Sequence, residues 1–352
     1  MERIAIITND DPRQPRGGAG RIADAQRQAL LDAGFEVRVF VAKFAFEKSS
    51  LSSRVFRHLK DLKPDATLVN EIKQFQPSVI ISHNLTGCGF GTPRALSLPK
   101  GTPGAIQSAG ARWIHILHDV QLFEPSGHLL DASRVTLWQR VWSNLRRRVF
   151  GCPDLVISPT AWLLEEHHRR RFFLKTKTVV LPNPAPLFKE FARMIHDPLR
   201  VLYVGRPTHD KGADVVEAVK ASVTFPLAVT TVTQKTHEEI MHEMEEADVL
   251  LVPSRIEENQ PTVILEAASC GLPVIASDKG GIQETLSGRG TVCAVDDTTA
   301  WIHALERLKN PEVYQQQSAG MIELAREHDP REYARMFCVL VTSVHLTLPS
   351  PS

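Results

Sequence analysis

Two glutamates and a glycine pair in the second half of the chain have the types and spacing of sugar- and phosphate-binding residues. Glu258 and Glu266 are separated by seven residues, and Gly280-Gly281 follow within VLLVPSRIEENQPTVILEAASCGLPVIASDKGGIQETL, residues 249–286. A carboxylate can accept two hydrogen bonds from a vicinal diol, such as that of ribose or a hexose. The amides of a glycine pair that opens a helix suit phosphate oxygens. Together these residues suit a nucleotide sugar.

The elements expected around these residues place them at one edge of a sheet. Val249–Val252 and Pro273–Ala276 are short apolar runs typical of buried parallel strands. Pro261 suits the first turn of the intervening helix, and Gly271 suits its end. Glu258 would then lie in a loop beyond the carboxyl end of a strand, with Glu266 about a turn and a half into the helix. Ligands of open α/β sheets bind at that edge.

The ordered block resembles the signature of family 4 glycosyltransferases, the retaining "group 1" enzymes of GT-B fold. The matching elements are PSxxE, the Glu-x7-Glu pair, EAxxCGLPVIAS and GGIxE. The resemblance implies transfer of a hexose-type sugar from a nucleotide diphosphate sugar to an acceptor, with retention at the anomeric carbon. It also implies that Glu258 orients the donor hexose and Glu266 its ribose.

A second motif lies earlier in the same half. Val204-Gly205-Arg206 follows an apolar strand, and Lys211-Gly212 opens the next helix. An arginine fork and a lysine point charge can clamp a diphosphate. The resemblance places Arg206 and Lys211 on the donor pyrophosphate, where they would stabilise the departing diphosphate. Since these cations can replace a metal ion, we expect neither a metal nor another cofactor.

Glycines also follow the first strand of the chain. Gly17-Gly18-Ala19-Gly20 is expected as a loop before a helix from about Arg21 to Ala33. Its spacing is not G-x-G-x-x-G, which disfavours a dinucleotide oxidoreductase. The resemblance implies that Gly17 and Gly18 face the donor phosphate or the acceptor.

Two histidines follow other expected strands of the first half. His118 comes after Trp113–Leu117, and His83-Asn84 comes after Ser78–Ser82. A neutral imidazole can hydrogen-bond a sugar hydroxyl. The resemblance places His118 near the transferring sugar, and His83 is a weaker candidate on the acceptor side.

Alternating strand and helix patterns in both halves predict the fold class α/β, as two doubly wound Rossmann-like domains facing a cleft. We expect an acceptor-side domain over residues 1–185 and a nucleotide-sugar-binding domain over 186–330. Residues 331–352 are expected as a tail that returns to the first domain. The proline-rich stretch 182–198 is expected as the interdomain connection.

The second domain is predicted to be trimmed by one βα unit relative to the resembled family. Between Lys211 and Ala247 we place one strand, Pro226–Thr233, and one helix, His237–Glu246. Recognition of the base therefore stays open. The shortening also leaves two alternatives to transfer, namely a non-catalytic nucleotide-sugar-binding protein and another GT-B enzyme such as a nucleotide-sugar epimerase.

Charge is divided unevenly along the 352 residues. Residues 1–195 hold 28 Lys and Arg against 17 Asp and Glu, a balance of +11, and the remainder carries −10. Residues 134–150 carry apolar side chains at 135, 138, 142, 145 and 149, which predicts a helix with one apolar stripe. With the arginine triplets at 146–148 and 169–171, it suits either a domain core or peripheral contact with an anionic membrane. A soluble anionic acceptor fits the charge as well.

Other compositional features indicate the cellular compartment of the protein. The chain has no apolar run of the length that a spanning helix needs, and it begins directly with a strand pattern. Its five cysteines form no C-x-x-C pair. We expect a cytoplasmic protein, either free or peripheral at the inner face of the membrane. No nucleic-acid-binding module is recognised, so nucleic acid is not an expected partner.

Overall fold

The computed structural model describes residues 2–15, 17–42, 61–97, 111–188 and 193–346. Contacts between residues divide the chain into two compact units. The first unit comprises residues 1–128, 133–181 and 331–352, and the second comprises residues 129–132 and 182–330.

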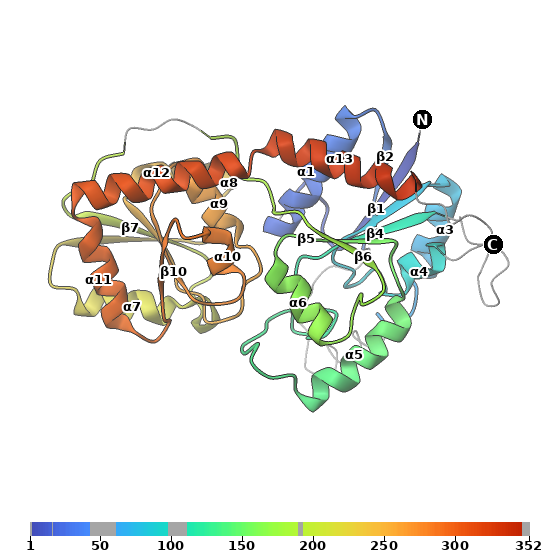
Figure 1. Ribbon diagram of the computed structural model, residues 1–352, viewed down its shortest axis with the longest axis horizontal. Helices are drawn as coiled ribbons and strands as arrows, with labels where there is room; N and C mark the ends of the chain where they lie inside the picture. Colours follow the sequence, from blue (N-terminus) through green and yellow to red (C-terminus); the bar gives the residue numbers. More distant parts are fainter. Residues whose placement is uncertain (1, 16, 43–60, 98–110, 189–192, 347–352) are drawn as a thin grey trace. The chain divides into compact units, whose positions relative to one another are not determined.

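The first unit is built on a six-stranded parallel sheet of order β2-β1-β3-β4-β5-β6 (Figure 1). Its strands are β1 (Arg3–Thr8), β2 (Glu36–Val41), β3 (Val79–Ser82), β4 (Arg112–Ile116), β5 (Leu155–Ser158) and β6 (Lys177–Val180). The central strands are fully buried apolar runs, as expected for a parallel sheet covered on both faces. In the register, Ile6 pairs with Val39 on one side and with Ile81 on the other.

Helices connect these strands, and one of them comes from the end of the chain. The helices are α1 (Gly18–Asp32), α3 (Ala66–Phe75), α4 (Thr92–Ser97), α5 (Leu137–Phe150), α6 (Ala161–Arg169) and α13 (Pro330–Leu346). Helix α13 places Phe337 and Val341 in the same apolar cluster as Ile6, and Gln26 of α1 donates a hydrogen bond to the Tyr333 hydroxyl at 2.6 Å. The segment after residue 330 is therefore part of the first unit, with α13 beside α1 (Figure 1).

The second unit is built on a five-stranded parallel sheet of order β11-β10-β9-β7-β8. Its strands are β7 (Leu199–Val204), β8 (Leu227–Val232), β9 (Val249–Val252), β10 (Val274–Ser277) and β11 (Thr291–Cys293). Its helical elements are η1 (His209–Lys211), α7 (Ala213–Ser222), α8 (His237–Glu246), α9 (Thr262–Ser269), α10 (Ile282–Leu286), α11 (Thr298–Leu308) and α12 (Pro311–Glu327). Between Lys211 and β9 lies a single strand, β8, as the sequence predicted.

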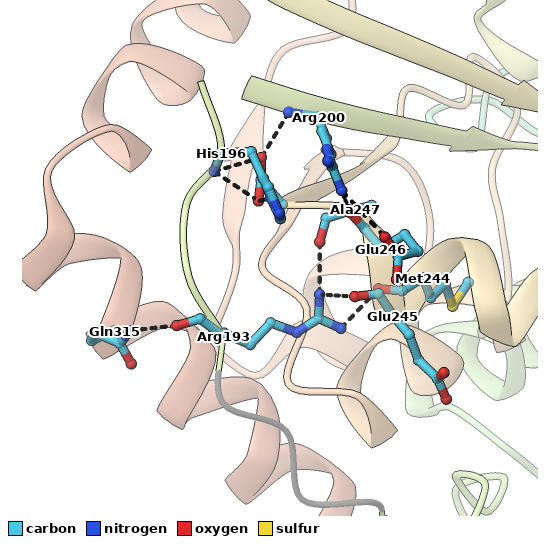
Figure 2. A network of polar contacts seen from close by, with 9 residues as sticks. Arg193, His196, Arg200, Met244, Glu245, Glu246, Ala247 and Gln315 are labelled. Atoms are coloured by element: carbon cyan, nitrogen blue, oxygen red, sulfur yellow. Dashed lines mark hydrogen bonds and ion pairs between the residues drawn. The ribbon is translucent and has the colours of Figure 1, made fainter. Parts of the chain in front are cut away.

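A buried arginine fixes the start of the second unit (Figure 2). The Arg193 guanidinium donates to the carbonyls of Met244 at 2.8 Å and Ala247 at 2.6 Å, at the end of α8. The last carbonyls of a helix lack partners within the helix and carry partial negative charge, so a cation suits this position. Beside it, the buried Asp248 carboxylate accepts from the Arg200 backbone N–H at 2.7 Å and contacts His196 Nδ1 at 2.8 Å. These contacts tie the segment before β7 to the body of the second unit.

No helix in the described part of the chain is both long enough and apolar enough to cross a membrane.

Candidate functional site

Two loops of the second unit bring Lys211 and Glu258 together. Lys211 ends the η1 turn after β7, and Glu258 lies in the loop after β9. The Lys211 Nζ is 2.5 Å from Glu258 Oε1, which also accepts a hydrogen bond from the Ser254 hydroxyl at 2.7 Å. Both charged side chains are partly exposed. The sheet therefore presents an ion pair, open to solvent, at the carboxyl ends of two adjacent strands, where open α/β sheets bind ligands.

Two glycines allow these loops to approach so closely. Gly212 has φ +74°, and a Cβ there would lie 1.8 Å from the Pro253 carbonyl oxygen. Gly280 has φ +62°, and a Cβ there would lie 2.1 Å from the Glu258 carbonyl oxygen. Any other residue would be strained in this backbone conformation and would also clash. The glycines of the KG and GG motifs thus set the backbone position of Glu258.

The Gly281 amide is hydrogen-bonded within the protein. It donates to the Glu258 carbonyl at 2.7 Å, and Gly281 directly precedes the short helix α10. In this structure the loop after β9 already uses the Gly281 N–H, and the role of the two glycine amides as phosphate donors stays a prediction. The glycine pair acts by holding that loop.

Arg206 and Glu266 lie in different environments of the same unit. The Arg206 side chain is largely exposed, and its guanidinium is 3.6 Å from Asp210. Glu266, on α9, is 3% exposed, with an oxygen 3.8 Å from His237 Nδ1 at the start of α8. An exposed cation in the loop after β7 can turn to an anionic ligand, whereas a buried carboxylate is already fixed in direction.

Sequence reasoning did not anticipate three neighbours of these residues. His237 beside Glu266 has no motif that marks it. Ser254 is the serine of PSxxE, so the motif could have identified it. Arg255 donates to Asp214 at 2.6 Å and also pairs with Asp296, and its hydrogen bond lowers the pKa of Asp214. Arg255 thereby anchors the β9 loop to α7.

The first unit has its own pocket at the carboxyl ends of its strands. This cavity, of about 600 Å³, is lined by the loop after β1, by Gly17 and Gly18, and by His83 and Asn84 after β3. The expected loop at residues 17–20 is wrong, because α1 already begins at Gly18. Gly20 is buried in that helix, where a Cβ would lie 3.0 Å from both Asp10 and Pro15. Packing, and not a flexible loop, requires this glycine.

His118 lies next to His83. Their Nε2 and Nδ1 atoms are 2.8 Å apart, and both residues also line a smaller pocket with Asp119. Burial lowers the pKa of His83 well below its usual value and that of His118 to about 4. Both rings are therefore neutral at pH 7, one as donor and the other as acceptor in their shared hydrogen bond. Burial also raises the pKa of Asp119 to about 6.

The structure thus assembles two groups of predicted residues. Lys211, Glu258, Gly280 and Gly281 converge in the second unit, with Arg206 in the adjoining loop. Gly17, Gly18 and His83 share the first unit's large pocket, and His83 contacts His118.

Comparison with known proteins identifies the family. The model "Glycosyl transferases group 1" matches residues 183–340, and the model "Glycosyltransferase Family 4" matches residues 16–187. The chain belongs to the family 4, group 1 glycosyltransferases. The family resemblance seen in the sequence is therefore confirmed over both halves of the chain.

One curated relative of this family is the D-inositol 3-phosphate glycosyltransferase of Corynebacterium urealyticum. It is 30% identical over 162 residues, which are 45% of this chain and 37% of that protein. The match thus spans little more than a third of the relative's length.

Solved structures of glycosyltransferases share the fold. Sucrose-phosphate synthase from Thermosynechococcus elongatus aligns with a TM-score of 0.75 at 18% identity, over 98% of this chain and 100% of that one. HepE from Anabaena, solved in complex with UDP-glucose, aligns with a TM-score of 0.65 at 15% identity, over 97% and 100% of the chains. The predicted GT-B fold class, with two Rossmann-like domains, is confirmed.

Proposed function

We propose that this chain is a retaining glycosyltransferase that moves a hexose-type sugar from a nucleotide diphosphate sugar to an acceptor. The observation that carries the proposal is the Lys211–Glu258 pair, 2.5 Å apart at the carboxyl ends of β7 and β9. Family membership and the UDP-glucose complex of HepE support a nucleotide-sugar donor.

The donor would bind to the second unit through groups at the carboxyl ends of its strands. Arg206 and Lys211 contact the diphosphate, Glu258 accepts hydrogen bonds from the hexose, and the buried Glu266 accepts from the ribose diol. Before the donor binds, Glu258 neutralises Lys211. The diphosphate competes for the lysine and leaves the carboxylate to the sugar hydroxyls.

In the proposed reaction the bond between the anomeric carbon and the diphosphate oxygen breaks. The acceptor hydroxyl attacks from the same face, so the configuration is retained, and its proton passes to the departing diphosphate. Negative charge grows on that diphosphate in the transition state, where Arg206 and Lys211 stabilise it. The neutral His118 donates or accepts a hydrogen bond with a sugar hydroxyl, and the pocket lined by Gly17 and Gly18 holds the acceptor.

A panel of nucleoside diphosphates and their sugars tests the proposal by thermal shift. The nucleoside diphosphate with the cognate base should raise the melting temperature of the wild-type protein. The matching nucleotide sugar should then be consumed when an acceptor is present. NMR of the product should show the anomeric configuration of the donor. An inverted product would refute the retaining mechanism, and the absence of any nucleotide-dependent shift would refute the donor class.

A non-catalytic nucleotide-sugar-binding protein is the second candidate. It is favoured by the single strand between Lys211 and β9, which leaves a smaller sheet in the donor-binding unit. Binding of a nucleotide sugar without transfer, hydrolysis or epimerisation would decide for this candidate.

A further inference from the structure

Helix α5 turns an apolar face to solvent. The side chains of Leu137, Trp138 and Val141 are more than half exposed, and Leu145 is partly exposed. At 100° per residue these four positions fall within one stripe along the helix. The sequence left open whether its apolar stripe is a core face. Trp142 is buried, but Trp138 and Leu145 are exposed, so the stripe does not serve as a core face along its whole length.

The opposite face of α5 is firmly packed. Trp142, Arg146 and Phe150 are all buried there. The Arg146 guanidinium lies 3.6 Å from the ring centre of Phe90 and 4.7 Å from that of Trp142. The inner face is thus occupied by contacts within the first unit, although Arg146 Nε and Nη1 have no hydrogen-bond partner among the described residues. The apolar side chains of the outer stripe remain exposed.

A pocket lined by arginines adjoins this stripe. It has a volume of about 340 Å³, lies between α5 and the end of α6, and is lined by Arg140, Arg147, Arg169, Arg170 and Arg171. Arg170 is buried and bound to Glu166 at 2.5 Å, and Arg169 contacts the same carboxylate at 2.6 Å. A single glutamate thus compensates two of the five cations.

Among the residues that the structure describes, the remaining arginines of the pocket have no acidic partner. Within the described residues, the side chains of Arg140 and Arg171 make no hydrogen bond or ion pair. Burial, followed by the positive charges of Arg171 and Arg148, lowers the pKa of Arg147. Residues 134–150 and 169–177 together contain ten Lys and Arg and no Asp or Glu. This surface therefore carries positive charge that an external anion would neutralise.

We propose that the outer face of α5 docks on an anionic lipid bilayer, with the arginine pocket receiving the phosphate of a lipid headgroup. Leu137, Trp138 and Val141 would enter the boundary between headgroups and acyl chains, where amphipathic helices insert by about 5–10 Å. Tryptophan is favoured at that depth. This inference goes beyond the proposed function and does not depend on it.

The combination of features favours a bilayer over other occupants. A free anion would satisfy the pocket but would leave the apolar stripe in water. A bilayer presents phosphates next to acyl chains. The α5 surface likewise carries arginines next to apolar side chains. It satisfies both parts of the surface at once.

Vesicle flotation with the full chain tests this proposal. Binding to vesicles of phosphatidylcholine mixed with phosphatidylglycerol is expected at low salt, with much weaker binding to phosphatidylcholine alone. Arg140→Gln with Arg171→Gln should weaken partitioning roughly 30-fold, since each basic residue near an anionic surface contributes roughly fivefold. Val141→Ser should weaken it roughly tenfold through lost apolar burial.

Matched variants on other elements serve as controls. Val339→Ser on α13 changes a valine that is 54% exposed, against 56% for Val141. Lys63→Gln with Lys220→Gln removes two exposed charges elsewhere, and neither control should alter binding. The fluorescence of Trp138 should be quenched by brominated acyl chains, and Trp138→Phe should lose most of this quenching.

Three outcomes would overturn the proposal. They are no binding to anionic vesicles at low salt, equal losses in the α5 variants and their controls, and stabilisation by inorganic phosphate without vesicle binding. In the last case the pocket would serve a soluble anion.

Discussion

Replacing Gly280 with alanine should separate two effects that coincide at this position. Both Gly280, at φ +62°, and Gly288, at φ +79°, have left-handed backbone conformations. A Cβ at Gly280 would lie 2.1 Å from the Glu258 carbonyl oxygen, whereas a Cβ at Gly288 would meet nothing within 4 Å. Gly288→Ala is therefore a matched control for the backbone strain alone.

The expected magnitudes follow from these distances. Left-handed backbone costs a non-glycine residue about 1–2 kcal/mol, which applies to both variants. At Gly280 the β9 loop must also move away from the new methyl group, and such overpacking typically adds about 1–3 kcal/mol. For a unit of this size, each kcal/mol lowers the melting temperature by roughly 2–4 °C. Gly280→Ala should therefore melt roughly 2–12 °C below Gly288→Ala.

The affinity for the donor should also differ between the two variants. Displacing the Glu258 backbone disturbs its contact with Lys211, so Gly280→Ala should bind the donor more weakly while Gly288→Ala binds normally. Differential scanning calorimetry and a titration with the cognate nucleotide sugar measure both effects. Equal melting temperatures and equal donor affinities would refute the structural role assigned to Gly280.

The remaining predictions concern charge and stability. Lys211→Ala should weaken binding of the nucleoside diphosphate by roughly 1.5–3 kcal/mol and leave the nucleoside little affected; equal losses for both ligands would make the lysine structural. Arg193→Met should lower stability by several kcal/mol, because the carbonyls of α8 and α9 lose a buried donor; an unchanged urea midpoint would contradict this. Burial lowers the pKa of His115 to about 3, below its unfolded value of about 6.5, so its contribution is present above pH 6.5 and is lost as the pH falls toward 3. His115→Gln should flatten this acid-side loss of stability between pH 7 and 5, whereas His242→Gln, at an exposed position, should not.

The sequence predicted the strands well for a physical reason. Buried parallel strands are largely apolar runs, so β9 has the predicted bounds Val249–Val252, and β10 (Val274–Ser277) is shifted by only one residue from the predicted Pro273–Ala276. Because parallel strands end at one edge, the strand-end rule also placed Glu258 and Lys211 in neighbouring loops. It could not show that they pair with each other.

The failures occur where tertiary packing overrides local pattern. In α5 the buried side chains include polar ones, among them Gln139, Ser143 and Arg146, so apolar periodicity does not by itself identify the buried face. Helix α1 begins at Gly18 and includes Gly20, where a Cβ would lie only 3.0 Å from Pro15. Residues 129–132 belong to the second unit through contacts of Leu129 and Ala132 with Glu257, for which the sequence holds no signal.

The most direct test of the proposed donor site combines a protein change with a ligand change at the ribose. Titration calorimetry would compare the cognate nucleoside diphosphate with its 2′-deoxy and 3′-deoxy analogues, in the wild-type protein and in Glu266→Ala. A hydrogen bond to a charged group contributes roughly 1.5–3 kcal/mol, so the wild type should prefer the ribose form to at least one analogue by roughly tenfold or more. In Glu266→Ala this preference should disappear. The same preference in both proteins, or no nucleotide binding in either, would contradict the assignment of the second unit as the donor-binding domain.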